Sequence, residues 1–318
     1  MIRAVQATSV AQRTAVDVAT AAQLACLLEA SAAKPGNVSP GRSFADLRYE
    51  DFLAGAAAIG APLAAADSQP LGVTIRAAID ATARWTHSNT NLGIVLLLAP
   101  IAKAAVRLPP SPLCGFGETG KAESTREDVV SGFSRTLRDA VRRVLDTTTI
   151  EDAREAYSAI RLAAPGGLGR VDDQDIADEP TRTLLDVMRL AAGRDSVARE
   201  YATAYDLTFM TGAPALARAR RDGLSWQDAI VETFLTILAA TPDTHIARRG
   251  GAAMADDVSR QARATLAAGG IRSRAGREAV ERMDHGLRDA RHVGNPGTTA
   301  DLTAAAIFVA LLDGAWTV

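Results

Sequence analysis

The chain has 318 residues and a formal net charge of −2, with 47% apolar residues but only 4% aromatic ones. A chain of this length can bury a large core without disulfides or metals. The near-neutral charge, with no basic stretch interleaved with aromatic residues, argues against a nucleic-acid partner. Abundant alanine with few aromatic residues favours tightly packed helices over strands. The composition therefore predicts a mainly helical protein that binds no nucleic acid.

The cysteines and the N-terminus indicate the compartment. Cys26 and Cys114 are the two cysteines and lack Cys-x-x-Cys spacing, which excludes a zinc ribbon and a disulfide framework and fits a reducing environment. Cys26 is predicted to be a buried core thiol. The N-terminus has no continuous apolar stretch, and the longest apolar run, Leu92 to Ala102, is well short of the roughly 20 residues that cross a bilayer. We expect a cytoplasmic protein with no membrane partner.

Apolar residues recur at helical spacing along most of the chain. In the first half the pattern predicts helices over Val10–Ala33, Tyr49–Ala66, Leu71–Trp85, Leu92–Val106, Val129–Leu145 and Glu151–Leu162. In the second half it predicts helices over Thr183–Ala192, Val197–Met210, Ala213–Arg221, Trp226–Ala240, Met254–Ala268, Ala275–Val293 and Thr299–Leu312. No strand-like alternation and no solenoid-type repeat appears. The expected fold is therefore a single all-α domain over residues 1–318, with an irregular stretch at about 107–127 and the polar chemistry in loops at helix ends.

One motif in the irregular stretch imitates a phosphate-binding loop. Gly115 to Lys121 matches Gly-x-Gly-x-x-Gly and most of a P-loop. However, Ala122 stands where a P-loop needs a serine or threonine for Mg²⁺, and prolines precede the motif where a strand is required. A surface loop explains this segment better.

The most informative segment is Thr241–Gly251, a short stretch read as a loop between two helices. Asp243 is a candidate metal ligand or base, and His245 is a candidate proton carrier or hydrogen-bond donor. Arg248 and Arg249 are candidate phosphate clamps, because guanidinium groups are planar, permanently charged donors. The alternative is that the arginines form structural ion pairs. Zinc is not expected, since no second His or Cys lies at ligand spacing around His245.

Two further loops carry polar groups that could meet an anion. In Ala33–Gly41, Lys34 supplies a cation, and Gly36 lets the backbone approach a ligand closely. The alternative is that Lys34 only caps the preceding helix. Thr86–Gly93 places Asn89, Thr90 and Asn91 at a helix start, where free N–H groups favour an anion, although ordinary N-capping explains them equally well.

An acidic loop and a helix start complete the set. Asp173 and Asp175 belong to the run from Asp172 to Asp175, which could supply oxygen ligands to Mg²⁺ or could simply be a solvated surface. In Asn295–Asp301, a capping box would explain Thr298 and Asp301 as structural residues. The Gly-Thr-Thr turn that includes Thr299 is also typical of an anion site.

Taken in order, these motifs resemble the triphosphoribosyl-dephospho-CoA synthase family, and the resemblance spans about Leu28 to Leu312. Each motif is short, so the specificity lies in the set and its order. The motifs are Lys34-Pro35-Gly36, Asn89-Thr90-Asn91-Leu92-Gly93, Asp243-Thr244-His245-Ile246 with Arg249-Gly250, and Asn295 through Asp301.

The resemblance implies an all-α fold and a pentosyltransferase. In the reaction of this family, the 2′-hydroxyl of 3′-dephospho-CoA displaces adenine from ATP. Such a step needs a base for the hydroxyl, stabilisation of an oxocarbenium-like centre, a proton for adenine and positive charge along the triphosphate. ATP and dephospho-CoA are then the expected substrates, Mg²⁺ the expected cofactor, and a homo-oligomer an open expectation.

The residues receive roles as hypotheses on this resemblance. Asp301 or Asp243 would act as base, and Asn89 and Asn91 would orient ribose or phosphate. The remaining roles are phosphate binding by Lys34, Arg248 and Arg249, and Mg²⁺ binding by Asp243 with Asp173 or Asp175. Glu29 matches a family glutamate, is expected to face the same cavity, and is grouped with the metal-binding residues.

This chain departs from the citrate-lyase-type pattern at two places. That pattern has Asn-Thr-His-Lys-Gly where this chain has Asn91 and Leu92 in place of the histidine and the lysine. It also has His-x-Asp where this chain has Phe44 and Asp46. Two alternatives therefore stay open: a transferase of the same scaffold acting on another phosphorylated or pterin-linked substrate in one-carbon cofactor biosynthesis, and a helical nucleotide-binding protein without activity.

Overall fold

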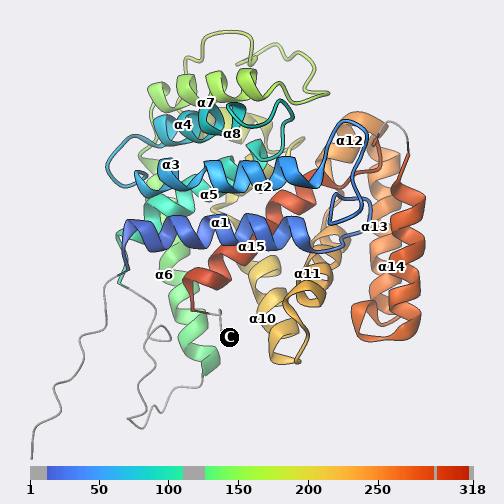
Figure 1. The fold of residues 1–318 in the computed structure, drawn as a ribbon. Helices are drawn as coiled ribbons and strands as arrows, with labels where there is room; N and C mark the ends of the chain where they lie inside the picture. Colours follow the sequence, from blue (N-terminus) through green and yellow to red (C-terminus); the bar gives the residue numbers. More distant parts are fainter. Residues whose placement is uncertain (1–12, 110–125, 290–291, 315–318) are drawn as a thin grey trace, which may run out of the picture.

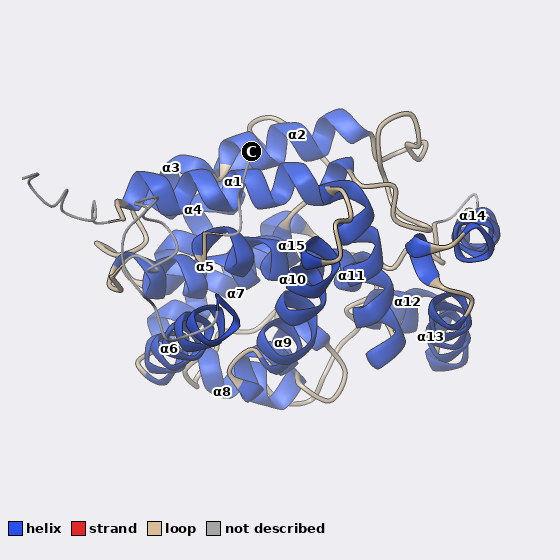
Figure 2. Cartoon of the chain, turned by 90° about the horizontal axis from the view of Figure 1, so that it is seen from below, coloured by secondary structure: helices blue, strands red, loops and turns tan. Residues whose placement is uncertain are grey.

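The computed structural model describes residues 13–109, 126–289 and 292–314, and within these it contains helices and no strand apart from one isolated bridge between Ser39 and Arg42. The predicted all-α fold is confirmed (Figure 2). The phosphate-loop-like motif and Cys114 lie outside the described residues, as does most of the irregular stretch at 107–127. Cys26 is buried, as predicted. No described helix is long and apolar enough to cross a membrane.

The first half of the chain forms seven helices, in which the fourth and fifth pack together and the sixth lies against the fifth. They are α1 (Ala15–Ser31), α2 (Tyr49–Ala58), α3 (Gly60–Ala64), α4 (Leu71–Ala83), α5 (Leu92–Val106), α6 (Arg126–Asp146) and α7 (Ile150–Ala163).

The second half supplies shorter helices around a long final one. They are α8 (Leu184–Ala191), α9 (Ser196–Thr203), the π-helical turn η2 (Thr208–Gly212), α10 (Ala213–Arg221), α11 (Trp226–Ala240), α12 (Thr244–Gly250), α13 (Ala252–Ala267), the 3-10 turn η3 (Gly270–Arg272), α14 (Arg274–Leu287) and α15 (Gly297–Leu312).

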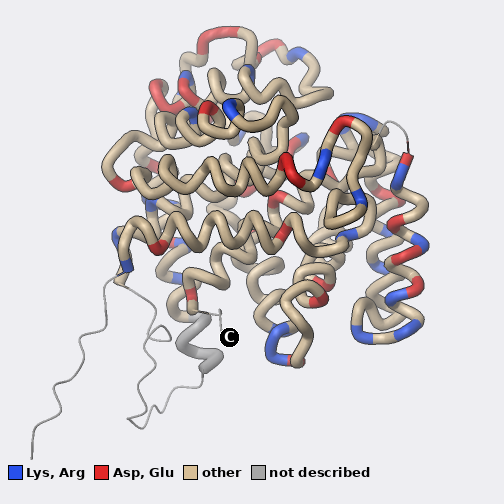
Figure 3. Tube along the Cα trace, in the orientation of Figure 1, with Lys and Arg blue, Asp and Glu red and all other residues tan. Residues whose placement is uncertain are grey.

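Helices α5 and α15 form the centre of the molecule. Helix α15 contacts α1, α5, α10 and α11, and nearly all of its residues are buried (Figure 1). Helix α5 is buried almost as completely and also contacts α1, α4 and α6. In contrast, α14 at the edge of the molecule alternates basic and acidic residues (Figure 3). The N-terminal ends of α5 and α15 therefore lie inside the protein. The motifs at Asn89–Gly93 and Asn295–Asp301 are at these ends.

A proline inside α5 determines how α9 packs. Pro100 has no N–H, so the carbonyl of Leu96 lacks its usual helical donor. The hydroxyl of Tyr201, in α9, donates to that carbonyl at 2.7 Å, and Tyr205 donates to the carbonyl of Leu97 at 2.8 Å. Both tyrosines are fully buried. These bonds fix α9, whose first residues border the cavity described below.

Four predicted elements differ from the structure. The predicted helix Ala275–Val293 ends at Leu287, where Arg288 adopts an extended backbone. The segment Thr241–Gly251 is not a loop, since α12 occupies most of it, with Asp243 as its N-cap. The predicted helix Tyr49–Ala66 is divided into α2 and α3, because Pro62 cannot donate to the carbonyl of Ala58. The predicted helix Val197–Met210 ends at Thr203, where Ala204 and Tyr205 adopt left-handed backbone conformations.

Candidate active site

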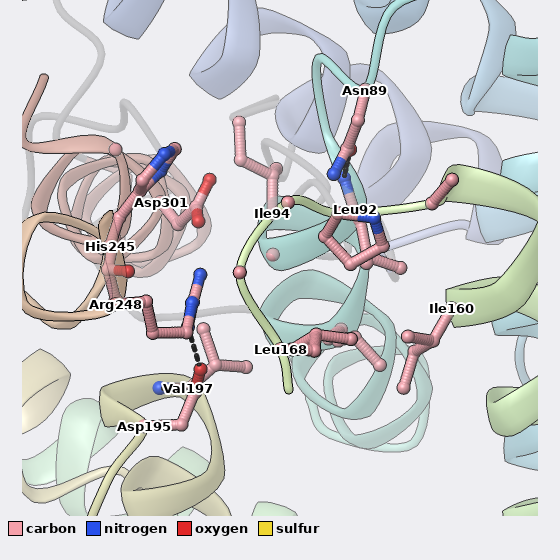
Figure 4. A pocket seen from close by; sticks show the side chains of 18 of the residues that line it. Asn89, Leu92, Ile94, Ile160, Leu168, Asp195, Val197, His245, Arg248 and Asp301 are labelled. Atoms are coloured by element: carbon pink, nitrogen blue, oxygen red, sulfur yellow. Dashed lines mark hydrogen bonds and ion pairs between the residues drawn. The ribbon is translucent and has the colours of Figure 1, made fainter. Parts of the chain in front are cut away.

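A cavity of about 730 Å³ lies where the N-terminal ends of α5 and α15 meet α12, α8 and α9. This volume suits a nucleotide-sized ligand. Figure 4 shows its two sides: Asp301, His245 and Arg248 on one, and Leu92, Ile160 and Leu168 on the other. The cavity thus joins a charged part to an apolar part.

Arg248 enters the charged part from α12 and is held by Asp195. Its Nη1 donates to Oδ2 of Asp195, and the side chain keeps 21% of its surface exposed. Asp195 is the N-cap of α9, where its Oδ1 accepts N–H bonds from Val197 and Ala198. The Nε of Arg248 is shielded and has no protein partner within the described part of the chain. Arg248 therefore forms the structural ion pair of one interpretation and also lines the cavity, as the phosphate-binding interpretation requires.

Arg249 and His245 form the neighbouring wall. Nη1 of Arg249 lies 3.4 Å from Nε2 of His245 and donates to the carbonyl of His292 at 3.3 Å. Burial, followed by the charges of Arg248 and Arg249, lowers the pKa of His245 to about 4. The imidazole is therefore neutral at pH 7, with Nε2 as an acceptor and Nδ1 carrying the proton.

Asp301 lines the cavity from the first turns of α15 and faces the first turn of α5. Its Oδ2 would lie 2.0 Å from a Cβ placed on Gly93, so any side chain at this position would have to displace the carboxyl. Burial raises the pKa of Asp301 well above its ordinary value, and the nearby carboxylates of Glu29, Asp243 and Asp195 raise it further. The alternative capping box is wrong, because Pro296 is the N-cap of α15 and no side chain caps the helix.

Asp243 lies behind the cavity wall and does not line it. Its Oδ1 accepts the N–H of Ile246, and its Oδ2 accepts both the N–H and the hydroxyl of Thr299 at 2.7 Å. The hydroxyls of Thr244 and Thr298 are 3.2 Å apart beside this cluster, and Thr298 does line the cavity. Asp243 and Thr299 therefore join α12 to α15.

Lys34 is fully buried and lies outside the cavity lining. Its Nζ is 2.9 Å from Oε1 of Glu29 and donates to the carbonyls of Glu29 and Ala32 at the end of α1. Lys34 therefore caps the C-terminal end of α1, as the alternative interpretation of the sequence held. Glu29 does line the cavity, and burial raises its pKa, although Lys34 opposes the shift. Gly36 has a left-handed backbone, and its N–H donates to Asp284, so it shapes the loop without lining the cavity.

The three polar residues directly before α5, Asn89, Thr90 and Asn91, line the cavity. Oδ1 of Asn89 accepts the N–H of Leu92, so Asn89 caps the helix as the alternative interpretation held. The side-chain amide of Asn91 donates to Thr82. The hydroxyl of Thr90 is buried without a partner among the described residues. Capping and cavity lining thus coexist at this helix start.

The acidic loop is organised by its own backbone. Asp175 accepts N–H bonds from Val171 and Ala177 and lines the cavity. Asp173 is exposed, pairs with Arg182 and lies outside the lining. Over the described ranges, no three His, Cys, Asp or Glu side chains are grouped closely enough to hold a metal ion. The predicted metal-binding carboxylates are therefore not brought together.

The comparisons with known proteins agree with one another. The family model described as ATP:dephospho-CoA triphosphoribosyl transferase matches residues 15–318. The chain belongs to this family. It is 29% identical over 248 residues to a Pseudomonas syringae protein named "Probable 2-(5''-triphosphoribosyl)-3'-dephosphocoenzyme-A synthase", covering 73% of this chain and 83% of that one. An Azotobacter vinelandii protein of the same name is 28% identical over 201 residues, covering 62% and 68% of the two chains.

The same fold occurs in a solved structure. A crystal structure of an Archaeoglobus fulgidus protein, described as a candidate triphosphoribosyl-dephospho-CoA synthase, superposes with a TM-score of 0.58 at 23% identity. It covers 82% of this chain and 99% of that chain, and shows that the two share the fold. The resemblance proposed from the short motifs is confirmed, and the chain is a transferase.

Sequence reasoning missed several cavity residues of this transferase. Asp195 and His292 line the cavity but stand in no motif, so only their tertiary contacts reveal them. The apolar part was missed as well, since it is built from α7, the following glycine-containing loop and α8. Its members are Ile160, Leu168, Leu184, Val187 and Met188.

Proposed function

We propose that this transferase moves the triphosphoribosyl group of ATP onto the 2′-hydroxyl of 3′-dephospho-CoA and releases adenine. One arrangement carries the proposal: Arg248 and Arg249 line the same cavity as the buried carboxyl of Asp301, beside an apolar part. A phosphate-binding wall, a proton-holding group and an apolar pocket are the elements that this reaction needs.

The triphosphate would lie along α12. The Nε of Arg248 has no partner among the described residues, and Asp195 already orients the side chain, so little side-chain freedom is lost on binding. Arg249 adds a second guanidinium on the next residue. Thr298 and Thr90 offer hydroxyls close to the N-terminal ends of α15 and α5, where helix dipoles favour negative charge.

The adenine ring would occupy the apolar part, against Leu168, Val187 and Met188. A flat, weakly polar ring gains most from burial there, while the charged phosphates stay with the arginines. Adenine leaves the anomeric carbon, which then lies between the two parts, near Asp301.

Asp301 would protonate the departing adenine. Burial and neighbouring carboxylates raise its pKa, which favours the protonated form and suits Asp301 to donate a proton as the glycosidic bond breaks. After donation, the carboxylate would stabilise the positive charge that develops on the ribose. Asp243 would act indirectly, by holding α12 and its arginines against α15.

Mg²⁺ would arrive with the triphosphate, as it does with many nucleotides. Glu29, Asp173, Asp175 and Asp243 are already engaged by Lys34, Arg182 or backbone N–H groups, so they do not form a ligand set. We also propose that the enzyme acts in the cytoplasm, where its nucleotide substrates are found; homo-oligomerisation stays a prediction that size-exclusion chromatography can test.

The deciding experiment incubates the purified protein with ATP, Mg²⁺ and 3′-dephospho-CoA and follows adenine by chromatography and the conjugate by mass spectrometry. Equal amounts of adenine and conjugate, with no adenine when the acceptor is omitted, support the proposal. Ligand-induced thermal stabilisation without any adenine would support the nucleotide-binding alternative instead. Adenine release with a pterin-linked acceptor but not with dephospho-CoA would support the other transferase.

A further inference from the structure

His292 lies at the edge of the cavity, in the segment between α14 and α15, and is paired with a residue far away in the sequence. Its Nε2 is 3.0 Å from Oδ1 of Asp46, while its ring packs on Phe44 with centroids 3.9 Å apart. The imidazole keeps 13% of its surface exposed, whereas Asp46 is 79% exposed. The imidazole is thus the buried partner of the pair and the carboxylate the exposed one.

The second ring nitrogen of His292 has no partner among the residues that the structure describes. Nδ1 of His292 is shielded from solvent and makes no hydrogen bond within the described part of the chain. Because Nε2 donates its proton to Asp46, Nδ1 presents a lone pair. Leaving a buried acceptor unsatisfied costs free energy, so such an atom calls for an explanation. A ligand hydroxyl that donates to Nδ1, once the cavity edge adjusts to admit it, would supply one.

The backbone of His292 is fixed to the phosphate-binding wall. Arg249 donates to its carbonyl, and the residue has a left-handed φ of 53°. A non-glycine residue in this conformation is uncommon and is retained where the surroundings impose it. Arg288 lies over the opposing Phe44 ring, 5.4 Å from its centroid. Among the described residues, the charged groups on the elements packed around the imidazole include Asp46, Arg249, Arg288 and Asp289.

We propose that His292, oriented by Asp46, is the general base that takes the proton of the acceptor's 2′-hydroxyl. The inference rests on the proposed triphosphoribosyl transfer. A carboxylate that fixes the tautomer of an imidazole, whose other nitrogen faces a hydroxyl, is the arrangement that activates oxygen nucleophiles in enzymes.

The step balances in protons and electrons. The O–H bond of the acceptor breaks and its proton moves to Nδ1, while the oxygen forms a bond to the anomeric carbon of ATP. The bond from that carbon to adenine breaks, its electron pair leaves with adenine, and adenine takes the proton of Asp301. The proton on His292 then returns to Asp301 through solvent.

Other groups near the cavity are less suited to this role. His245 is neutral with Nε2 directed at Arg249, Asp195 is engaged by Arg248, and Glu29 is paired with Lys34. Asp243, one of the two bases predicted from the sequence, does not line the cavity. Asp301, the other, fits the opposite role of proton donor.

The test compares wild type with H292A, H292Q, D46N and the control H285A, all with ATP and dephospho-CoA. His285 lies in α14 and does not line this cavity. We expect H292A and H292Q to lower kcat by about 10² to 10⁴, with KM for ATP changed less than about threefold. Added imidazole should restore part of the H292A activity, D46N should lower kcat less, and H285A should match wild type.

The possible results separate a failure of the proposed function from a failure of the proposed base. If wild type releases no adenine, the proposed function itself fails. If wild type is active and either His292 variant keeps kcat within about threefold, the base is another group. The proposal would also be overturned if folded H292Q lost activity through a higher KM for ATP and added imidazole did not restore the activity of H292A. Circular dichroism melting checks that each variant folds, and H292Q stands in should H292A unfold.

Discussion

Asp195 binds the guanidinium of Arg248 through one carboxylate oxygen and caps helix α9 through the other. The N-terminus of α9 and the cation of α12 are therefore positioned by the same side chain. Tyr201 in α9 donates to the carbonyl of Leu96, which Pro100 leaves without a helical donor in α5. The position of Arg248 therefore depends, through Asp195 and α9, on the central helix α5.

Replacing Arg248 by glutamine should weaken ATP binding while leaving the fold intact. A lost charge-assisted contact is worth about 1.5–3 kcal/mol, which corresponds to a rise in KM for ATP of roughly 10- to 100-fold. Arg260 is the matched control, because it is exposed on α13 and pairs with Asp257 away from the cavity. Steady-state kinetics of R248Q and R260Q check this, and equal KM values would remove Arg248 from the site.

Replacing Asp243 by asparagine should chiefly lower stability. The amide cannot accept all three bonds from Ile246 and Thr299, so buried donors lose partners at a cost of about 1–3 kcal/mol in the free energy of unfolding. D257N, at an exposed position of α13, should stay within about 0.5 kcal/mol. Urea unfolding measures both; a stable D243N with abolished turnover would instead make Asp243 a catalytic residue.

The buried pair of Lys34 and Glu29 distinguishes a structural lysine from a phosphate-binding one. K34M should cost about 3–5 kcal/mol of unfolding free energy, because it leaves the carboxylate of Glu29 buried without its partner. The double variant E29L/K34M should recover much of that loss. A double-mutant cycle in urea gives the coupling. An undiminished stability of K34M together with a higher KM for ATP would favour the role predicted from the sequence.

His245 should make the protein less stable in acid. Its folded pKa of about 4 lies below the ordinary value of 6.5, so the neutral ring favours the folded state at neutral pH. That contribution is complete above pH 6.5 and declines by up to about 3 kcal/mol as pH falls to 4. H245Q should lose this part of the pH dependence. Unfolding free energies of both proteins at pH 7 and pH 4.5 provide the test, and parallel curves would contradict it.

Gly93 should be irreplaceable for activity. A Cβ there would meet Oδ2 of Asp301, so G93A must displace the carboxyl, and a misplacement of this size can cost tenfold or more in kcat. G286A is the matched control in α14, where nothing lies near an added Cβ, and it should keep full activity with slightly higher stability. If the adenine-release rates of G93A and wild type coincide, Asp301 has no close part in the chemistry.

The sequence predicted the helices well where burial is continuous. Helices α5 and α11 have the predicted bounds, because long apolar runs leave little choice of secondary structure. Breaks inside helical patterns were harder. The end of α9 depends on Glu200, which is buried and accepts the N–H groups of Leu207 and Thr208, a tertiary arrangement that spacing does not encode.

The site was predicted only as far as local motifs reach. Asn89, Arg248 and Asp301 come together in the cavity, since each stands at a helix end with an open side. The residue types of Asp243 and Lys34 suggested metal and phosphate binding. Both are instead buried outside the cavity lining, because their burial depends on helices distant in the sequence. His292 gave no signal, because its partner Asp46 belongs to another loop.

Phe44 illustrates what a motif comparison overlooks. At this position, where the citrate-lyase-type pattern has a histidine, this chain has a phenylalanine. In the folded protein, the ring of His292 lies against Phe44 and contacts Asp46, two residues further along the chain from Phe44. A comparison of aligned sequence positions would record the loss of a histidine, whereas a comparison of the folded proteins would find an imidazole beside Asp46. When an active site is built from loops, related enzymes are therefore best compared by where their functional groups lie in the structure.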